Sequence, residues 1–448
     1  MKNFLIVLMS TCLITIIATP VFAADVKFSG SYVVQGYYEN NRKLSSDDLA
    51  TGSTQGPSIS DTWQRLRLQT DFQVAEGLKL TTRFDAMEKV WGAPRSATVT
   101  ANDSGTPNAE AENIKFEHVY MIFNVPIGTF TIGYMTQGVW ATAFGDTGEQ
   151  DYGARVKWDL ATGPFFWGAR WDKVEGKMGY PTPPAPVEHD YAKYSVLGGY
   201  KWSTGDAGLQ ITYYLDTSNA DNPTTGYKSK YWLFQPYAKA KLGIVYIETE
   251  FGLLAGKDRE YLNENWSAGR VDRDIIGWRG YLMANVDLAP AYVGGMIFYA
   301  SGDDPATSDK NEGGAKIGTD FTPCLLLFNY DLVRWNGVLG NAYGLSEGSN
   351  VDNVQGYQIF AGVKPIPKLN LKVSATYAKL NRDLTTTPLV GKDLGYEADI
   401  TAAYKIYDNL EYMIGFGYLW AGDAFKNTNA AGIVNNDYLL THKLTLSF

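Results

Sequence analysis

The chain has 448 residues, of which 45% are hydrophobic and 14% aromatic, with 46 glycines and a formal net charge of −9. The acidic balance and the lack of a basic cluster exclude a nucleic-acid-binding surface. The two cysteines are too few for a disulfide framework or a cysteine-based metal site, and no motif indicates a cofactor. The three histidines, His118, His189 and His442, are too scattered to predict a metal site.

The first residues have the features of a secretory signal peptide. Lys2 precedes an apolar stretch from Phe4 to Thr19, and small residues precede a cleavage site after Ala23. This stretch is shorter than the roughly eighteen residues that mark a transmembrane helix, and no later apolar stretch reaches that length. We therefore expect residues 1–23 to be removed and residues 24–448 to form one domain. Its net charge would be −10, since Lys2 is the only charge lost.

After the signal peptide, apolar and polar residues alternate in many segments of strand length. Such a period of two predicts β-strands with one apolar face and one polar face. In chain order, clear examples are residues 26–38, 62–74, 78–87, 153–160, 208–216, 277–288, 369–380, 396–407 and the C-terminal segment.

The connections between these segments alternate between short and long. Three-residue links such as residues 75–77, 126–128 and 161–163 are followed by polar stretches such as residues 94–113 and 175–190. This alternation is typical of an antiparallel up-and-down meander whose hairpins all open toward the same two sides. We count about eighteen strands, or sixteen if two weak segments fail.

The charges on the polar face indicate that this face is wet, so the apolar face must be covered by something other than a protein core. A closed barrel with its apolar face toward lipid satisfies every backbone group and leaves no strand edge unpaired. The sequence therefore predicts an all-β fold, a transmembrane up-and-down antiparallel β-barrel of about 18 strands. Its short turns would be periplasmic and its long loops extracellular.

The last strand ends on a bare phenylalanine. Its apolar face is similar to the recognition signal that the barrel-assembly machinery of Gram-negative bacteria reads in its clients. The residues that carry this resemblance are Tyr438, Leu440, Leu444, Leu446 and Phe448.

Together these features resemble a Gram-negative outer-membrane porin over essentially the whole mature chain. Residues 128–158 resemble the porin segment in which a strand is followed by a loop that folds into the lumen. Residues from Phe298 onward have a local likeness to alginate-export-like barrels, from which they depart at the insertion NEGGAKIG. The resemblance implies outer-membrane lipid, the barrel-assembly machinery and small hydrophilic solutes or ions as partners, with a homotrimer as one option and no nucleic acid.

Basic residues with lumen parity and an acidic loop suggest a constriction. If the loop at about residues 138–151 bends inward, its acidic residues would face the basic residues of the wall across a narrow gap and create a transverse field. The alternative is that both groups are ordinary solvated side chains. The basic residues are Arg65, Arg67, Arg83, Arg155 and Arg170, and the acidic residues are Asp146, Glu149 and Asp151.

The sequence thus predicts a porin for passive diffusion and not an enzyme. The alternatives are a scaffold or sheath for a membrane-spanning partner and a dedicated polysaccharide export channel. An outer-membrane lipase is the enzyme alternative, with His118 on the lipid-facing side, but no serine stands in a companion motif. The long region at about residues 302–353 could be an extra strand, an inward loop or a packed lid.

Overall fold

The computed structural model describes most of the chain beyond the expected signal peptide. The described residues are 25–41, 44, 58–92, 114–176, 190–220, 226–261, 270–329, 351–383, 389–426 and 428–448. The expected signal peptide, residues 1–23, and His189 therefore lie outside the described part. Among the described residues, no helix is both long enough and apolar enough to cross a bilayer.

The described residues form eighteen long strands and one strand of two residues, β14. The strands at the N-terminal side are β1 (Asp25–Glu39), β2 (Ile59–Ala75), β3 (Leu78–Val90), β4 (Ile114–Val125), β5 (Gly128–Gly138), β6 (Gly148–Thr162), β7 (Phe165–Gly176), β8 (Asp190–Trp202) and β9 (Gly205–Asp216). They are followed by β10 (Tyr227–Leu242), β11 (Val245–Tyr261), β12 (Arg273–Leu288), β13 (Ala291–Ala300), β14 (Lys310–Asn311), β15 (Val354–Ile366), β16 (Leu369–Leu380), β17 (Asp393–Tyr407), β18 (Leu410–Ala421), the 3-10 turn η3 (Asp423–Lys426) and β19 (Asp437–Ser447).

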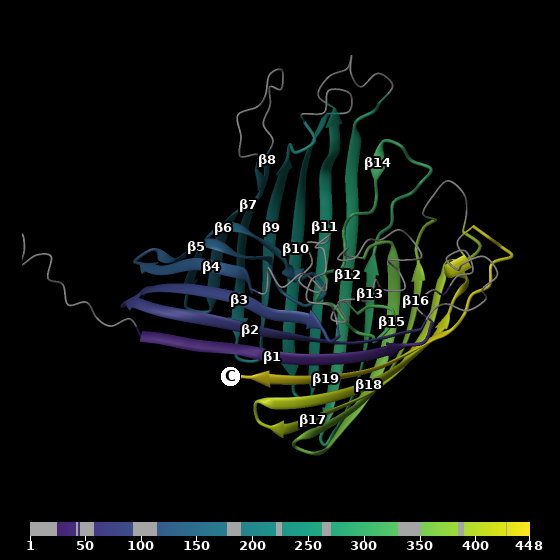
Figure 1. Cartoon of the computed structure of the whole chain (residues 1–448). Coiled ribbons are helices and arrows are strands. Elements are labelled where there is room, and N and C mark those ends of the chain that lie inside the picture. Colours follow the sequence, from purple (N-terminus) through teal and green to yellow (C-terminus); the bar gives the residue numbers. More distant parts are fainter. Residues whose placement is uncertain are drawn as a thin grey trace, which may run out of the picture.

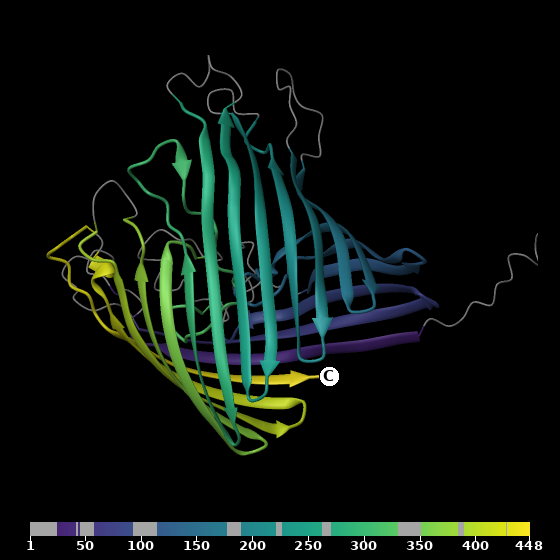
Figure 2. The ribbon, with the colours of Figure 1, turned by 180° about the vertical axis from the view of Figure 1, so that it is seen from behind.

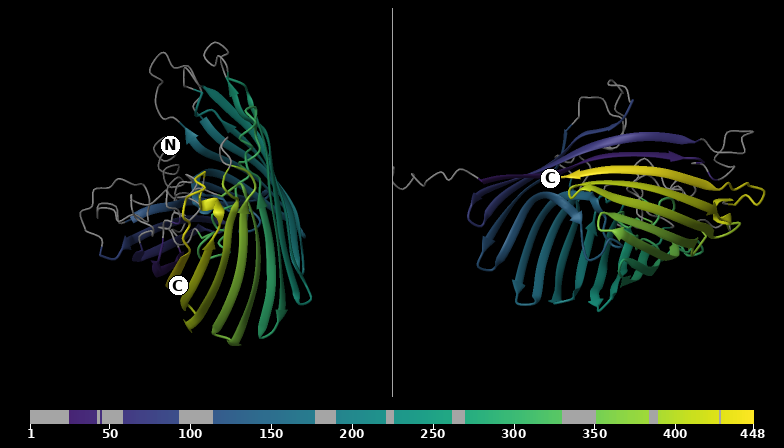
Figure 3. Two further views of the ribbon diagram at one scale, coloured as in Figure 1. Left: turned by 90° about the vertical axis from the view of Figure 1, so that its right-hand side faces the viewer. Right: turned by 90° about the horizontal axis from the view of Figure 1, so that it is seen from below.

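Each long strand pairs antiparallel with its neighbours in the chain, and β13 pairs with β15 across the intervening loop. The sheet closes where β1 pairs with β19, from Ser31 opposite Ser447 to Glu39 opposite Leu439. Figure 1 shows this closure as the purple β1 beside the yellow β19, and Figure 2 shows the continuous wall from behind. The predicted all-β antiparallel barrel of eighteen strands is confirmed, and the views in Figure 3 show the strands fanned around one interior.

The two faces of the wall differ as the alternation predicts. Large apolar side chains are exposed on the outer face, with Ile359 on β15 exposed by 70% and Phe28 on β1 by 63%. Aromatic rings gather near both ends of the strands, as in the edge-to-face contact Phe165–Tyr200 and the tilted contact Tyr377–Tyr396. An apolar band between two aromatic belts is the surface that a barrel presents to lipid.

One irregularity moves a histidine to the inner face. The register between β3 and β4 shifts between Arg83, which lies opposite His118, and Phe84, which lies opposite Phe116. This bulge places both Glu117 and His118 in buried positions on the lumen side, while Phe116 stays 59% exposed outside. The interpretation of His118 as a lipid-facing residue is therefore wrong, because a strict alternation cannot reveal a bulge.

The main hydrophobic core lies inside the barrel. The loop after β13 turns inward, and within residues 312–329, which we call the lumen segment, the structure describes no strand. Its buried residues pack with inward side chains of the wall such as Tyr281 and Phe298. The buried residues of the lumen segment in this core are Ile317, Phe321, Cys324, Leu326, Leu327 and Phe328. Of the three alternatives for this region, its described part is an inward loop.

Candidate functional site: two segments inside the barrel

The basic residues singled out in the sequence lie on the inner face of β2, β3, β6 and β7. Each of them forms an ion pair with a carboxylate of the barrel wall. Arg67 donates through Nε and Nη2 to both oxygens of Asp85, at 2.7 Å each. Glu117 Oε2 accepts from Arg67 Nη2 at 2.9 Å and from Arg83 Nη2 at 3.0 Å. Arg65 lies 3.9 Å from Asp85. The result is a network of alternating charge on the barrel wall itself.

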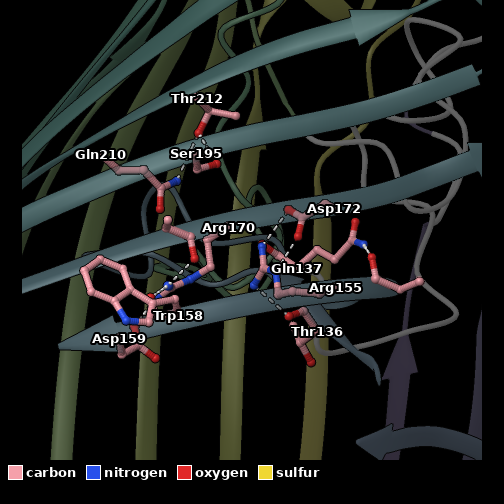
Figure 4. Close-up of polar contacts among 12 residues, drawn as sticks. Thr136, Gln137, Arg155, Trp158, Asp159, Arg170, Asp172, Ser195, Gln210 and Thr212 are labelled. Carbon is pink, nitrogen blue, oxygen red and sulfur yellow. Dashed lines mark hydrogen bonds and ion pairs between the residues drawn. The ribbon is translucent and has the colours of Figure 1, made fainter. Parts of the chain in front are cut away.

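Arg155 on β6 ties this wall to the start of an inward loop. Its guanidinium pairs with Asp172 on β7, with Nε to Oδ1 at 2.5 Å and Nη2 to Oδ2 at 2.8 Å. The same group donates to the main-chain oxygens of Thr136 and Gln137 at the end of β5, at 3.1 Å and 2.6 Å. Figure 4 shows Arg155 between these partners. Arg155 thus fixes the direction in which the chain leaves β5.

A second arginine and a row of uncharged polar groups continue along the wall. Arg170 on β7 donates to Asp159 Oδ1 at 2.5 Å and to the main-chain oxygen of Trp158 at 2.8 Å. Ser195 on β8 and Thr212 on β9 share a hydrogen bond of 2.9 Å between their hydroxyls. These groups belong to β6, β7, β8 and β9, and Figure 4 shows them along the neighbouring strands. They give the lumen a wet surface along β6 to β9.

Residues 139–147, which we call the inner loop, connect β5 to β6 and contact the wall at β10 to β12. Trp140 Nε1 donates to the main-chain oxygen of Gln235 on β10 at 3.0 Å. Lys239 Nζ donates to the main-chain oxygen of Ala141 at 2.9 Å. Phe144 is fully buried and stacks on Tyr281 of β12 with ring centroids 5.1 Å apart. The inner loop therefore runs through the lumen from one part of the wall to another.

A buried ion pair holds the tip of the inner loop. Glu250 on β11 accepts from the hydroxyl of Thr142 at 2.7 Å and from its main-chain N–H at 3.2 Å. Arg279 on β12 lies 3.5 Å from Glu250 and donates to the main-chain oxygens of Gly145, in the inner loop, and Lys316, in the lumen segment. Glu250 and Arg279 therefore position both inward segments from a single point on the wall.

The two inward segments also bind one another. Gly318 N–H donates to the main-chain oxygen of Phe144 at 2.8 Å, and Thr319 Oγ1 donates to that of Thr147 at 2.9 Å. The approach requires glycine, because a Cβ on Gly318 would lie 2.0 Å from the main-chain oxygen of Asp146. The inner loop and the lumen segment thus form one assembly within the barrel.

Between this assembly and the wall lies a cavity of about 360 Å³, which we call the eyelet cavity. Four basic side chains, those of Arg155, Lys193, Arg279 and Lys316, and one acidic side chain, that of Asp172, are among its lining residues. Hydroxyl and amide groups of β8 to β10 complete one side. Three of these charged groups belong to ion pairs already described, since Arg155 pairs with Asp172 and Arg279 pairs with Glu250.

Of the three acidic residues predicted for the constriction loop, only Asp146 lies in the inner loop. The inner loop ends at Thr147, because Gly138 pairs with Gly148 and extends the hairpin between β5 and β6. Glu149 and Asp151 consequently lie on β6 and not in a loop, and their side chains lie outside the described set. Asp146 lies in the inner loop and its main-chain oxygen accepts from Asp320 N–H at 3.2 Å. A transverse field between these acids and the arginines stays a prediction.

Sequence reasoning missed the residues that position the two inward segments. Glu250, Arg279 and Glu397 are all buried charged residues near the middle of strands. Their inward parity and charge could have drawn attention to them. Nothing in the sequence shows which segments they hold, since Thr142 and Glu250 are 108 residues apart.

The solved structures that resemble this chain are outer-membrane channels. No protein-family model matches the sequence, and no curated protein matches it. The structure is similar to Pseudomonas aeruginosa OccD3 (OpdP), with a TM-score of 0.51 and 12% identity over 94% of this chain and 91% of that one. It is also similar to P. aeruginosa OccK9 (OpdG), with a TM-score of 0.51 and 10% identity over 94% and 99% of the two chains. A third similar structure is P. aeruginosa OpdQ, with a TM-score of 0.50 and 12% identity over 95% of this chain and 97% of that one.

At sequence identities of 10–12%, the similarity to these solved structures shows the fold of the chain. The chain has the closed antiparallel barrel fold of Gram-negative outer-membrane channels, in agreement with the predicted porin-like architecture. Its apolar outer face and charged interior are those of a transmembrane barrel.

Proposed function

We propose that the protein is an outer-membrane porin through which small hydrophilic solutes diffuse passively, with a preference for anions. The observation that carries the proposal is the eyelet cavity, a wet space inside a closed barrel whose lining holds four basic side chains and one acidic side chain. A barrel of this size is wide enough for an aqueous passage, so the inward segments that narrow it determine what passes. The charges at the narrowest point act on the ion most strongly.

The fold comparison supports a channel over an enzyme, because the similar solved structures are channels. The position of His118 supports the same choice. Its ring lies in the lumen, with Nε2 2.9 Å from Thr136 Oγ1. A lipase of the outer face would need that residue on the opposite side of the wall.

The test is the reversal potential of the purified protein in a planar bilayer under a KCl gradient. We expect stepwise conductance with chloride preferred over potassium. The double variant Lys193→Gln and Lys316→Gln should reduce this preference, because both side chains line the eyelet cavity. Lys368→Gln is the matched control, since Lys368 lies in the short turn between β15 and β16, and it should leave the reversal potential unchanged.

Two outcomes would contradict the proposal. A cation preference that the double variant does not alter would show that the eyelet cavity is not the selective passage. A barrel that is silent in the bilayer and co-purifies with a second protein would favour the alternative of a scaffold or sheath.

A further inference from the structure

One carboxylate on the wall receives three successive main-chain N–H groups of the lumen segment. Glu397 on β17 accepts from Leu325 and Leu326 through Oε1, at 2.9 Å and 2.6 Å, and from Leu327 through Oε2 at 2.7 Å. The residue is 1% exposed. Buried N–H groups need an acceptor, and successive N–H groups form a concavity that favours an anion.

The neighbouring contacts hold the same stretch of the lumen segment against the same part of the wall. Gln358 on β15 donates through Nε2 to the main-chain oxygen of Pro323 at 2.8 Å. Cys324 Sγ lies 3.3 Å from Thr376 Oγ1 on β16. Leu326 and Leu327 are almost fully buried in the core that also contains inward side chains of β18 and β19. Residues 323–327 are therefore docked on β15 to β17, and the core extends this contact to the closing strands.

The carboxylate also sits in a cluster with Asp399 and Cys324, whose potential ligand atoms lie within 4.8 Å of one another. We do not assign this cluster to a metal, because both oxygens of Glu397 already accept hydrogen bonds from the lumen segment. Lys372, a competing cation, lines the adjoining cavity of about 190 Å³ together with Asp399. The described contacts of Glu397 are those of a docking residue.

We propose that Glu397 is a positioning residue that sets the size limit of the channel. By holding residues 323–327 on β15 to β17, it closes that side of the lumen and leaves the eyelet cavity as the passage. This inference rests on the proposed porin function and deepens it. Glu250 and Arg279 position the other end of the same assembly, so loss of Glu397 frees only the side of the lumen that faces β15 to β19.

The first test compares Glu397→Ala and Glu397→Gln with the wild-type protein in single-channel recordings and in the swelling of liposomes with neutral sugars of increasing size. Both variants should raise the single-channel conductance about twofold or more and admit larger sugars, because conductance follows the open cross-section. Glu411→Gln is the control. Glu411 is an exposed acid beside the short turn between β17 and β18, and no described contact joins it to the lumen segment, so its loss should leave the sugar size limit unchanged.

The second test tethers the lumen segment in its place. Thr376→Cys puts a thiol opposite Cys324, whose sulfur lies 3.3 Å from the present hydroxyl oxygen. In the Glu397→Ala background, oxidation of the two thiols should form a disulfide and restore the wild-type size limit, and a reductant should abolish this restoration. Two thiols lose two protons and two electrons to the added oxidant, such as copper phenanthroline with dissolved oxygen.

The thiol itself gives a third readout. Burial raises the pKa of Cys324, so it stays protonated and reacts slowly with a maleimide while the lumen segment is docked. Glu397→Ala should increase the labelling rate about tenfold or more, because the thiolate is the reactive form and undocking removes its burial.

The outcomes separate the inference from the function on which it rests. If the wild-type barrel and the variants all fail to conduct, the porin function itself is wrong. If the wild type conducts and folded Glu397 variants keep its conductance and sugar limit, the inference is overturned. It is also overturned if the oxidised tether leaves the variant as wide as before. If neither Glu397 variant gives a heat-modifiable folded band, Glu397 supports the barrel and does not set its size limit.

Discussion

Glu250 and Arg279 show how much of the inner arrangement depends on two side chains. Both are buried, and together they hold Thr142, Gly145 and Lys316. Removing one member of such a pair leaves an uncompensated charge in a buried site, whereas removing both does not. The pair therefore links stability to the position of the inward segments.

We predict that Glu250→Ala lowers the free energy of unfolding by about 3–5 kcal/mol, because it leaves Arg279 buried without its carboxylate. The double variant Glu250→Ala and Arg279→Leu should be more stable than Glu250→Ala alone. Urea unfolding in lipid vesicles, followed by tryptophan fluorescence, measures both differences. A double variant that is no more stable than Glu250→Ala alone would show that the pair does not couple.

The sequence could indicate which of these residues face the lumen, but it could not indicate their partners. Arg67 and Asp85 have inward parity in their strands, so both belong on the wet face. Their bidentate contact depends on the register of β2 against β3, in which Arg67 lies opposite Asp85. The register is set by the whole hairpin and its turn, so it cannot be predicted from a single residue.

The C-terminal strand can be predicted from neighbouring residues, whereas the path of the inner loop depends on residues far away in the sequence. The apolar and polar residues of β19 alternate over eleven consecutive residues. Tyr438 and Leu440 have the same parity as Phe448, which follows the strand. Phe448 closes the barrel by exchanging main-chain hydrogen bonds with Gly30, at 2.8 Å and 3.1 Å. The inner loop has no such local pattern, and its path depends on acceptors far away in the chain.

Deleting Phe448 should reduce the amount of folded barrel in the membrane several-fold, since it removes the main-chain pair with Gly30 beyond the β1–β19 ladder and the terminal residue of the predicted assembly signal. The measurement is the fraction of protein with heat-modifiable mobility in a gel after expression. Ser447→Ala keeps the main-chain ladder and the terminal ring and should assemble normally. Equal folded fractions for the deletion and the wild type would contradict the prediction.

The complete barrel combines an apolar outer surface with an interior that is partly filled. Because lipid takes the place of a protein core outside, apolar residues on the outer face stabilise the barrel only in a bilayer. The hydrophobic core inside the barrel belongs to the lumen segment and the strands that receive it. The two faces of one wall therefore tolerate very different substitutions.

Ile359→Arg should destabilise the barrel by about 2–4 kcal/mol in vesicles, because Ile359 lies in the middle of β15 on the outer face and a charged side chain there enters the hydrocarbon. Ile359→Ala is the control and should cost clearly less. Both are measured by urea unfolding in vesicles and again in detergent micelles. An equal loss for the two variants in vesicles would show that Ile359 does not face lipid.

The sequence by itself determined the strand order, the up-and-down topology and the face of the wall on which most side chains lie, and it left the number of strands at eighteen or sixteen. It could do so because a period of two and the lengths of the connections are local properties of the chain. Only the tertiary structure decided that Glu117 forms a bulge, that the inner loop ends at Thr147, and that Glu250, Arg279 and Glu397 hold the inward segments. These features arise from contacts between residues that are far apart in the sequence, where a small difference in register or loop direction changes every partner.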